Sequence, residues 1–324
     1  MKLLHNLSYG PLVERAIRDG FGDGMVELGK NNPLVVGLTA DLTESTRLDR
    51  FAQKHPDRFF QVGVAEQNMI GVAAGLAHEG FIPFAASYAV FSPGRTLDQI
   101  RLSVCYSQNN VKIVGSHAGL SVGPDGATHQ ALEDVAIMRT LPHMTVVVPS
   151  DAVEAKRATL ALAAHRGPAY LRLGREKVPT LTTDRTPFEI GKALTLTHGN
   201  DVTVIANGPM VFPAVQAAHQ LDGKLSVRVI NLHTVKPLDH VALLSAARET
   251  GAIVTAEDHQ VYGGLGSAVA EFVSIHHPVP VIPVGVKDMF GESGTAAELM
   301  QRFNLTTAAI IEAITQAIKV RDAR

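Results

Sequence analysis

The chain has 324 residues, 46% of them hydrophobic and 19% charged, which is the composition of a folded protein with room for two domains. Its formal net charge of −2 gives no field that would draw nucleic acid or an anionic membrane to its surface. The single cysteine, Cys105, excludes an internal disulfide framework, and because no signal-like or membrane-length apolar run occurs, we predict a cytoplasmic protein.

The first half of the chain alternates helical and strand-like segments. Residues 11–30 repeat apolar side chains at spacings of three and four, which predicts an amphipathic helix. The short apolar runs that follow have the character of buried parallel strands, with helical stretches between them. The predicted strands are residues 34–38, 59–64, 111–116 and 145–149, and the predicted helices are residues 66–78, 94–106 and 151–164. This alternation is what βαβ architecture requires.

A second set of α/β segments follows a change in composition. Residues 176–186 mix proline, threonine and charge without periodicity, which is typical of a linker. Beyond them the predicted strands are residues 202–206, 225–231, 252–256 and 279–284, and a helix is predicted at residues 238–248. We therefore predict two α/β domains rich in parallel sheet, at residues 1–180 and 187–324.

Neither the glycine-rich turn nor the histidines complete a ligand motif. Gly263, Gly264 and Gly266 precede a helix, but Val269 stands where a dinucleotide-binding fingerprint needs its third glycine. A packing turn is the better interpretation. None of the fourteen histidines is paired at metal-ligand spacing with a carboxylate or thiol nearby, so we predict no metal ligands in this chain.

Glu66 lies where an apolar strand ends and an apolar helix begins, the position at which ligand sites gather in parallel sheets. The helix that follows is apolar nearly all round, so we expect Glu66 to be partly buried and suited to proton transfer. The alternative is a carboxylate that stabilises the helix dipole by roughly 0.3–1 kcal/mol. Spacing alone slightly favours that structural explanation.

The loop at residues 117–130 follows directly on a predicted strand and carries His117, Asp125 and His129 among glycines. Such a loop forms a polar lining for a hydroxylated substrate, although by itself it is equally typical of a surface turn. Tyr88 and Phe91 could form an aromatic wall, but aromatic residues at this spacing more often belong to a core.

Four segments of the chain occur, in the same order, in one known family. The segments are ADLTES at residues 40–45, GVAEQNMIG at 63–71, PDGATHQ at 124–130 and LGR at 173–175. On their evidence the chain resembles the pyrimidine-binding and C-terminal domains of transketolases, from residue 18 to residue 320. The resemblance implies transfer of a two-carbon ketol unit between sugar phosphates with thiamine diphosphate as cofactor.

The resemblance also implies roles for individual residues. Glu66 matches the glutamate that hydrogen-bonds N1′ of the cofactor's aminopyrimidine, and Tyr88 and Phe91 match aromatic positions that pack on this ring. Catalytic roles fall to Glu66, His117 and His129. The substrate-binding positions are Arg18, Ser45 and Arg175 around a phosphate, and His117, Asp125 and His129 at the sugar hydroxyls and carbonyl.

One part of the family pattern is missing. Gly22-Asp23-Gly24 opens like the motif that binds the cofactor's diphosphate and Mg²⁺, but it lies in a predicted helix with no strand before it. Asn31 and Asn32 come too soon to close that motif. The resemblance is therefore to the second subunit of a split transketolase, whose N-terminal partner subunit carries the motif, and we expect an α2β2 assembly.

Two departures leave alternatives open. Gln67 stands where transketolases often have histidine, and Gly94-Arg95 replaces a third pocket aromatic, as in deoxyxylulose-phosphate synthases. The β subunit of a 2-oxo-acid dehydrogenase has the same two domains, but the Thr-His-Gln loop and Arg175 argue against it. A silent regulatory paralogue is a further alternative, against which the retained Glu66, His117, Asp125 and His129 argue.

Overall fold

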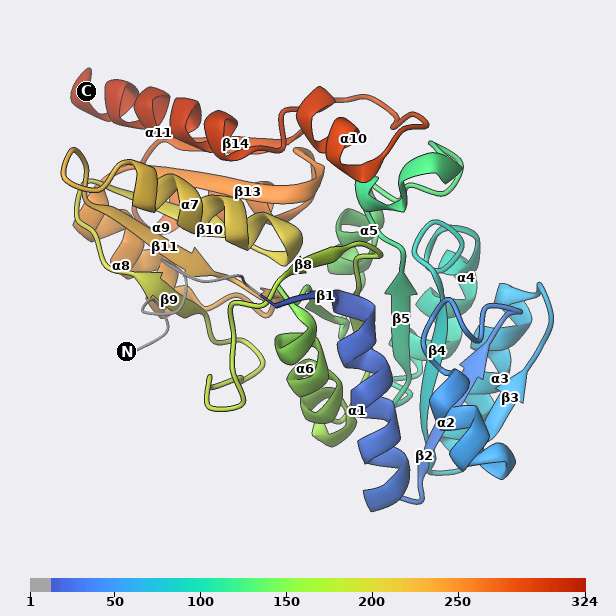
Figure 1. The fold of residues 1–324 in the computed structure, drawn as a ribbon. Helices are drawn as coiled ribbons and strands as arrows, with labels where there is room; N and C mark the ends of the chain where they lie inside the picture. The colour runs from blue at the N-terminus through green and yellow to red at the C-terminus, as the bar shows by residue number, and fades with distance from the viewer. Residues whose placement is uncertain (1–12) are drawn as a thin grey trace.

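Two mostly parallel β-sheets, each covered by helices on both faces, build the protein (Figure 1). The computed structural model describes residues 13–324, so the first two residues of the helix predicted at residues 11–30 lie outside the described residues. The α/β fold class with two parallel-sheet-rich units is confirmed.

The first sheet has the strand order β12-β6-β7-β5-β4-β2-β3, and its neighbours are parallel except for the pair β12 and β6. Its strands are β2 (Val35–Thr39), β3 (Phe59–Gln61), β4 (Ile82–Tyr88), β5 (Lys112–Ser116), β6 (Thr145–Val147), β7 (Ala169–Arg172) and β12 (Thr234–Lys236). A separate ribbon pairs β1 (Glu14–Ala16) with β8 (Lys177–Pro179). Strands β2 and β5 are buried along their whole length, because helices cover both faces.

The helices divide between the two faces of this sheet. One face packs against α1 (Ile17–Asn31), α2 (Asp49–Lys54) and α6 (Ala152–Ala164). The other packs against α3 (Glu66–His78), the π-helical segment η4 (Ile100–Tyr106) and α5 (Asp134–Thr140). Short helical turns complete the unit: η2 (Pro56–Arg58), η3 (Gly94–Thr96), α4 (Leu97–Gln99) and η5 (Leu120–Asp125).

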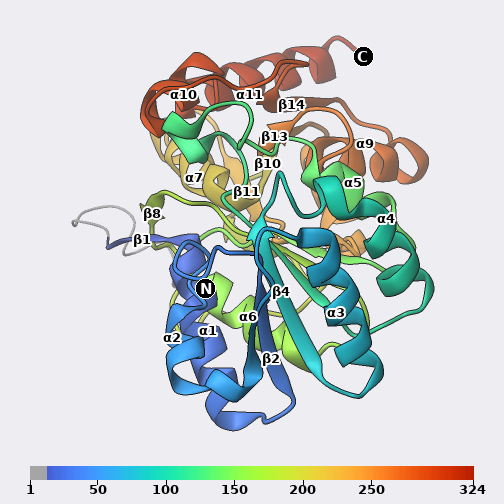
Figure 2. The same ribbon diagram turned by 90° about the vertical axis from the view of Figure 1, so that its right-hand side faces the viewer.

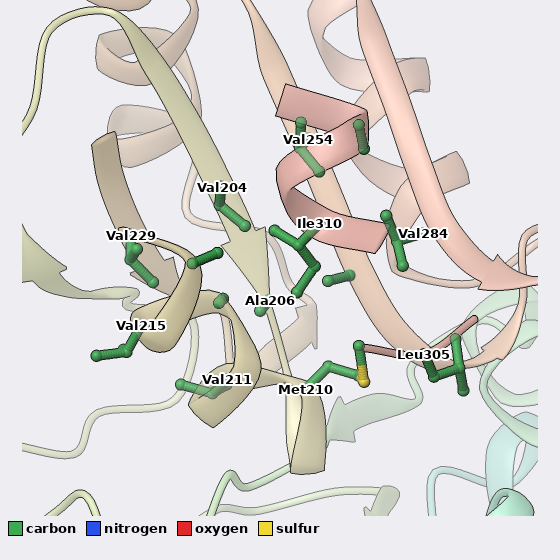
Figure 3. Packing of buried hydrophobic residues seen from close by; sticks show 14 of the residues in the cluster. Val204, Ala206, Met210, Val211, Val215, Val229, Val254, Val284, Leu305 and Ile310 are labelled. Atoms are coloured by element: carbon green, nitrogen blue, oxygen red, sulfur yellow. The ribbon is translucent and has the colours of Figure 1, made fainter. Parts of the chain in front are cut away.

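The second sheet has the order β14-β13-β10-β11-β9 and is parallel except at its β9 edge. Its strands are β9 (Leu194–Thr197), β10 (Val202–Ala206), β11 (Val227–Asn231), β13 (Ile253–Gln260) and β14 (Val281–Val286). The helices around it are η6 (Gly208–Met210), α7 (Val211–Gln220), α8 (His240–Thr250), α9 (Leu265–His276), α10 (Ala296–Arg302) and α11 (Thr307–Asp322). Figure 3 shows strand valines packed against α7 and α11.

Most predicted elements are confirmed, but strands β1, β4, β7, β8, β9 and β12 were not predicted. Pro83 at the second position of β4 explains one of these omissions, because proline is unusual in a central strand. The helical stretch predicted at residues 94–106 is confirmed over those bounds, but the helix type changes along it, from the 3-10 turn η3 through the short α4 to the π-helical η4. The predicted linker at residues 176–186 contains β8, which pairs with β1.

The two halves of the chain share one sheet and a buried polar contact. Strand β12 comes from the second half but pairs with β6 of the first sheet. Glu154 of α6 is 2% exposed and accepts hydrogen bonds from the Ser150 backbone at 2.6 Å and from Asn231 Nδ2 of β11 at 2.8 Å. Burial, followed by the charge of Asp151, raises the pKa of Glu154 to about 7.

We predict that Glu154 makes the protein less stable as the pH rises. The folded protein holds a proton on this carboxyl that the unfolded chain has released, so the stabilisation is complete below about pH 4.5 and is lost as the pH passes about 7. Glu154→Gln removes the ionisation, and it should gain roughly 3 kcal/mol relative to wild type between pH 5 and pH 8. Urea unfolding at both pH values measures this, and an equal difference at both would contradict it.

Candidate functional site

The predicted site residues come mainly from the carboxyl ends of five adjacent strands. In parallel α/β sheets this edge is where ligands bind. The ends of β7, β5, β4, β2 and β3 and the segments that follow them contribute residues, and Figure 2 shows β4 and β2 running toward this edge. The contributed residues are Arg175, His117, Tyr88, Ser45 and Glu66, in that strand order, and Arg18 joins them from α1.

Glu66 is the first residue of α3 and its side chain is 1% exposed. Ser87 Oγ of β4 donates to its Oε1 at 3.3 Å, and Arg95 Nη1 donates to its Oε2 at 3.0 Å. The Arg95 guanidinium carbon also lies 4.6 Å from the centroid of the Phe91 ring. The carboxylate is therefore held in one orientation by a hydroxyl and a cation, and it keeps lone pairs free for a further donor.

An aromatic and polar cleft of about 530 Å³ opens beside Glu66. Tyr88 and Phe91 have nearly parallel rings with centroids 5.9 Å apart, and the His129 ring meets Phe91 edge-on at 5.4 Å. His129 Nδ1 lies 2.9 Å from Thr128 Oγ1. The cleft is lined by Ala40, Asp41, Leu42, Val64, Glu66, Tyr88, Phe91, Asp125 and His129.

A cluster of arginines lies around His117, next to the aromatic cleft. The His117 ring stacks on Tyr88 at 3.9 Å, and its Nε2 lies 3.0 Å from Arg18 Nη1. Since arginine can only donate, Nε2 accepts and the proton lies on Nδ1, which faces Ser116 Oγ at 3.0 Å. Burial and the charges of Arg18 and Arg175 lower the pKa of His117 to about 3.

The remaining predicted substrate residues join this cluster. Arg18 Nη1 donates to the backbone carbonyl of Ser45 at 2.8 Å, so the contact with Ser45 is made by its main chain. Arg175 lies 3.7 Å from Asp125, and its guanidinium also donates to the carbonyl of Val122. The structure therefore brings all nine predicted site residues into one continuous set of contacts.

Sequence reasoning gave no role to three residues of this site, although it noted Arg95 in place of a pocket aromatic. Ser87 and Arg95 contact Glu66, but Ser87 lies in the unpredicted strand β4 and Arg95 follows a proline-glycine turn. Arg47 has a φ of 67° and forms an ion pair with Asp19 at 2.7 Å. Burial is the main cause of the lowered pKa of Arg18, and the charge of Arg47 is the second. The only feature of the sequence that pointed to Arg47 was its position two residues after Ser45.

The two tempting glycine motifs have structural explanations. The Glu257 carboxylate accepts the backbone N–H groups of Leu265 and Gly266 at 2.7 and 2.8 Å, so it fills the N-terminus of α9 that a phosphate would need. Gly22-Asp23-Gly24 lies inside α1, as predicted. Among residues 13–324, no group of three or more histidine, cysteine, aspartate or glutamate side chains is placed to hold a metal ion.

Comparison with known proteins identifies the family. The transketolase pyrimidine-binding domain matches residues 13–180, and the transketolase C-terminal domain matches residues 191–310. The 6-deoxy-6-sulfo-D-fructose transketolase subunit SqwH of Clostridium sp. (strain MSTE9) is 44% identical over 97% of this chain and 98% of its own length. One subunit of the apulose-4-phosphate transketolase of Phocaeicola vulgatus is 39% identical over 94% of this chain and 98% of its own length.

A solved structure described as a split gene transketolase, inactive beta4 tetramer, superposes with a TM-score of 0.89 at 46% identity, covering 94% of this chain and 99% of that chain. The chain belongs to the transketolase family. Within it, the chain is the C-terminal subunit of a split transketolase, a transferase that moves ketol units between sugar phosphates, and the family implies thiamine diphosphate as cofactor.

We predict that His117 stays neutral, with its proton on Nδ1, from pH 5 to pH 8, because burial and the neighbouring arginines disfavour its cation. Nitrogen-15 imidazole spectra should show no titration of this residue in that range, with His117→Asn providing the assignment. In Arg18→Met, which removes one of these charges, the pKa of His117 should rise. A wild-type midpoint near 6.5 would contradict the prediction.

Proposed function

We propose that this chain activates thiamine diphosphate and binds the sugar, while a partner N-terminal subunit supplies the ligands for the diphosphate and Mg²⁺. The observation that carries this is the charge of the cleft. Its lining includes the carboxylates of Asp41, Glu66 and Asp125 but no lysine or arginine. A diphosphate needs cations or a metal to be held, so this cleft suits only the uncharged part of the cofactor.

The cleft fits an aminopyrimidine ring. Tyr88 and Phe91 offer ring faces, Leu42 and Val64 offer apolar contact, and Glu66 presents a carboxylate fixed by Ser87 and Arg95. In the proposed role Glu66 exchanges a proton with the ring nitrogen N1′. When bound, the cofactor supplies the electron sink for breaking a carbon–carbon bond of the ketose.

The arginine cluster is the proposed site for the anionic end of the sugar. Arg18 and Arg175 supply cationic donors. His117 is neutral, so it can lie beside these arginines without adding a positive charge. His129 and Asp125 line the cleft between this cluster and Glu66, where a sugar's hydroxyls and carbonyl would lie. The two curated relatives are named for a sulfo-sugar and a sugar phosphate, which supports an anionic sugar as substrate.

We further propose a domain division and a cellular location for this chain. One is the division into domains at residues 1–180 and 187–324, and the other is a cytoplasmic location. Within residues 13–324, no helix has the length and apolar character needed to span a bilayer.

We predict that Glu66→Gln assembles with the partner subunit but loses turnover by roughly 10²–10⁴-fold, because an amide cannot accept the proton that the carboxylate exchanges. The measurement is steady-state ketol transfer by the reconstituted complex with thiamine diphosphate and Mg²⁺. Turnover within about threefold of wild type would remove Glu66 from the mechanism.

The same assay tests the need for a partner. The purified chain alone should neither bind thiamine diphosphate tightly nor transfer ketol groups, since its cleft lacks cations for the diphosphate. Robust activity of the single chain would overturn the split-subunit proposal. Lack of cofactor binding with any N-terminal transketolase subunit would instead favour a silent paralogue.

The exposed face of α3 supports self-association of this chain. Gly71 and Gly75 lie one turn apart, and a Cβ atom at either would meet nothing within 4 Å. Glycine inside a helix costs about 1 kcal/mol relative to alanine, and no contact within residues 13–324 requires it here. Leu102 and Tyr106 of the adjacent η4 are 45% and 81% exposed. A second copy packing closely on this face would explain both features.

We predict an α2β2 complex in which two copies of this chain meet over α3 and bury more than about 2,000 Å². Light scattering should give a mass of two copies of each subunit, and Gly71→Leu should reduce it. Glu312→Leu adds similar bulk to the exposed side of α11 and is the matched control. A mass of one copy of each subunit in the active complex would refute the arrangement.

A further inference from the structure

The loop that carries Asp125 and His129 is held by the C-terminal half of the chain at two points. Near its start, the Leu120 backbone N–H donates to Asp258 Oδ1 of β13 at 3.1 Å. At its end, Gln130 Nε2 donates to the carbonyl of Glu292 at 3.1 Å. In Figures 1 and 2, α10 lies against the green helical segment after β5, which is η5 of this loop.

Gln130 makes the second of these connections with one buried amide. Its side chain is 4% exposed, and Nε2 also donates to the carbonyl of Gly123 within the loop at 3.3 Å. One NH₂ group thus joins the middle of the loop to the segment after β14. The amide oxygen is buried, has no hydrogen-bond partner among residues 13–324, and faces Gly291. Gln130 therefore makes its side-chain contacts through the two N–H groups of Nε2.

Glycines in the loop and in residues 291–294 allow the two segments to approach closely. A methyl group on Gly291 would overlap the Gln130 amide oxygen, and one on Gly126 would come within 2.6 Å of Ser293 Oγ. A methyl group on Gly123, which has a φ of 72°, would lie 3.3 Å from the Gly294 carbonyl. The loop and residues 291–294 therefore interlock over several contacts rather than touching at one point.

We propose that Gln130 is a positioning residue: it ties the sugar-binding loop to residues 291–294, so that the C-terminal domain sets the geometry of Asp125 and His129. This inference rests on the proposed function, in which those two side chains meet the sugar. The loop contains three glycines and can hold its polar side chains in place only through such external contacts. The proposed cofactor contacts at Glu66, Tyr88 and Phe91 come from other segments, and of the loop's side chains His129 meets the two aromatic rings edge-on.

The test compares ketose binding with cofactor binding in the reconstituted enzyme. Gln130→Met keeps the bulk but loses both donors, and Gly291→Ala pushes the amide away. We expect each to lower kcat/KM for a ketose phosphate, fructose 6-phosphate or xylulose 5-phosphate, by at least tenfold. The Kd of thiamine diphosphate should stay within twofold of wild type. Glu292→Gln is the matched control, because it breaks only the exposed pair with Arg302 and leaves the carbonyl in place.

A double variant tests whether the two positions act through one contact. Gln130→Ala empties the space that the methyl of Gly291→Ala would enter, so the double variant should be no worse than Gln130→Ala alone. Additive losses, an unchanged kcat/KM in both single variants, or a matching loss of cofactor affinity would each overturn the proposal.

Asp125→Asn and His129→Ala separate this proposal from the proposed function. If they leave kcat/KM for the ketose unchanged, the sugar-binding roles and the positioning role both fail. If they impair it while Gln130→Met and Gly291→Ala do not, the proposed function stands and only the positioning role is wrong.

Discussion

At the end of β7, Arg172 donates from Nε to Asp134 Oδ2 at 2.8 Å and from Nη2 to the carbonyl oxygens of Asp258 and Ala131. Tyr170 donates to the same Asp134 oxygen at 2.6 Å. Burial alone would raise the pKa of Asp134, but the charge and hydrogen bond of Arg172 hold it below its usual value. Removing one partner of such a buried pair typically costs about 3–5 kcal/mol, since the other charge is left unpaired.

The site depends on this contact because two of the three residues that accept from Arg172, Ala131 and Asp258, also hold the loop at residues 117–130. Ala131 accepts the Gly119 backbone N–H at 2.9 Å, and Asp258 accepts that of Leu120 through its side chain. One guanidinium thus joins β7, α5, the loop and β13 of the second sheet. Charge is divided across the site: arginines gather after β7 and β2 and at the start of α1, while the carboxylates of Asp41, Glu66 and Asp125 line the cleft. Under the proposed function, the arginines hold the anion of the substrate, and the carboxylates leave the cofactor's diphosphate to the partner subunit.

Local sequence patterns predicted the strand ends and the residues that follow them, because period and position in a βαβ unit are short-range properties. Glu66 and His117 were found in this way, while family resemblance connected them with Arg18 and Arg175. Ser87 was missed because Pro83 hid β4, and the π-helical η4 has no simple sequence signature. The contact between Gln130 and Glu292 joins residues 162 positions apart, and no local pattern could have predicted it.

Glycines separate constraints inside this chain from those that lie outside it. Gly264 lies against the Glu257 carboxylate and Gly20 against the Ala152 carbonyl, so a methyl group at either is excluded by the chain itself. Gly71 and Gly75 have open space around them and lie in a regular helix, where glycine is costly and alanine would fit. Their helix begins at Glu66, so a second copy that covered them, as proposed, would also hold the helix that carries this carboxylate. In the proposed assembly, self-association and cofactor activation are therefore coupled through α3.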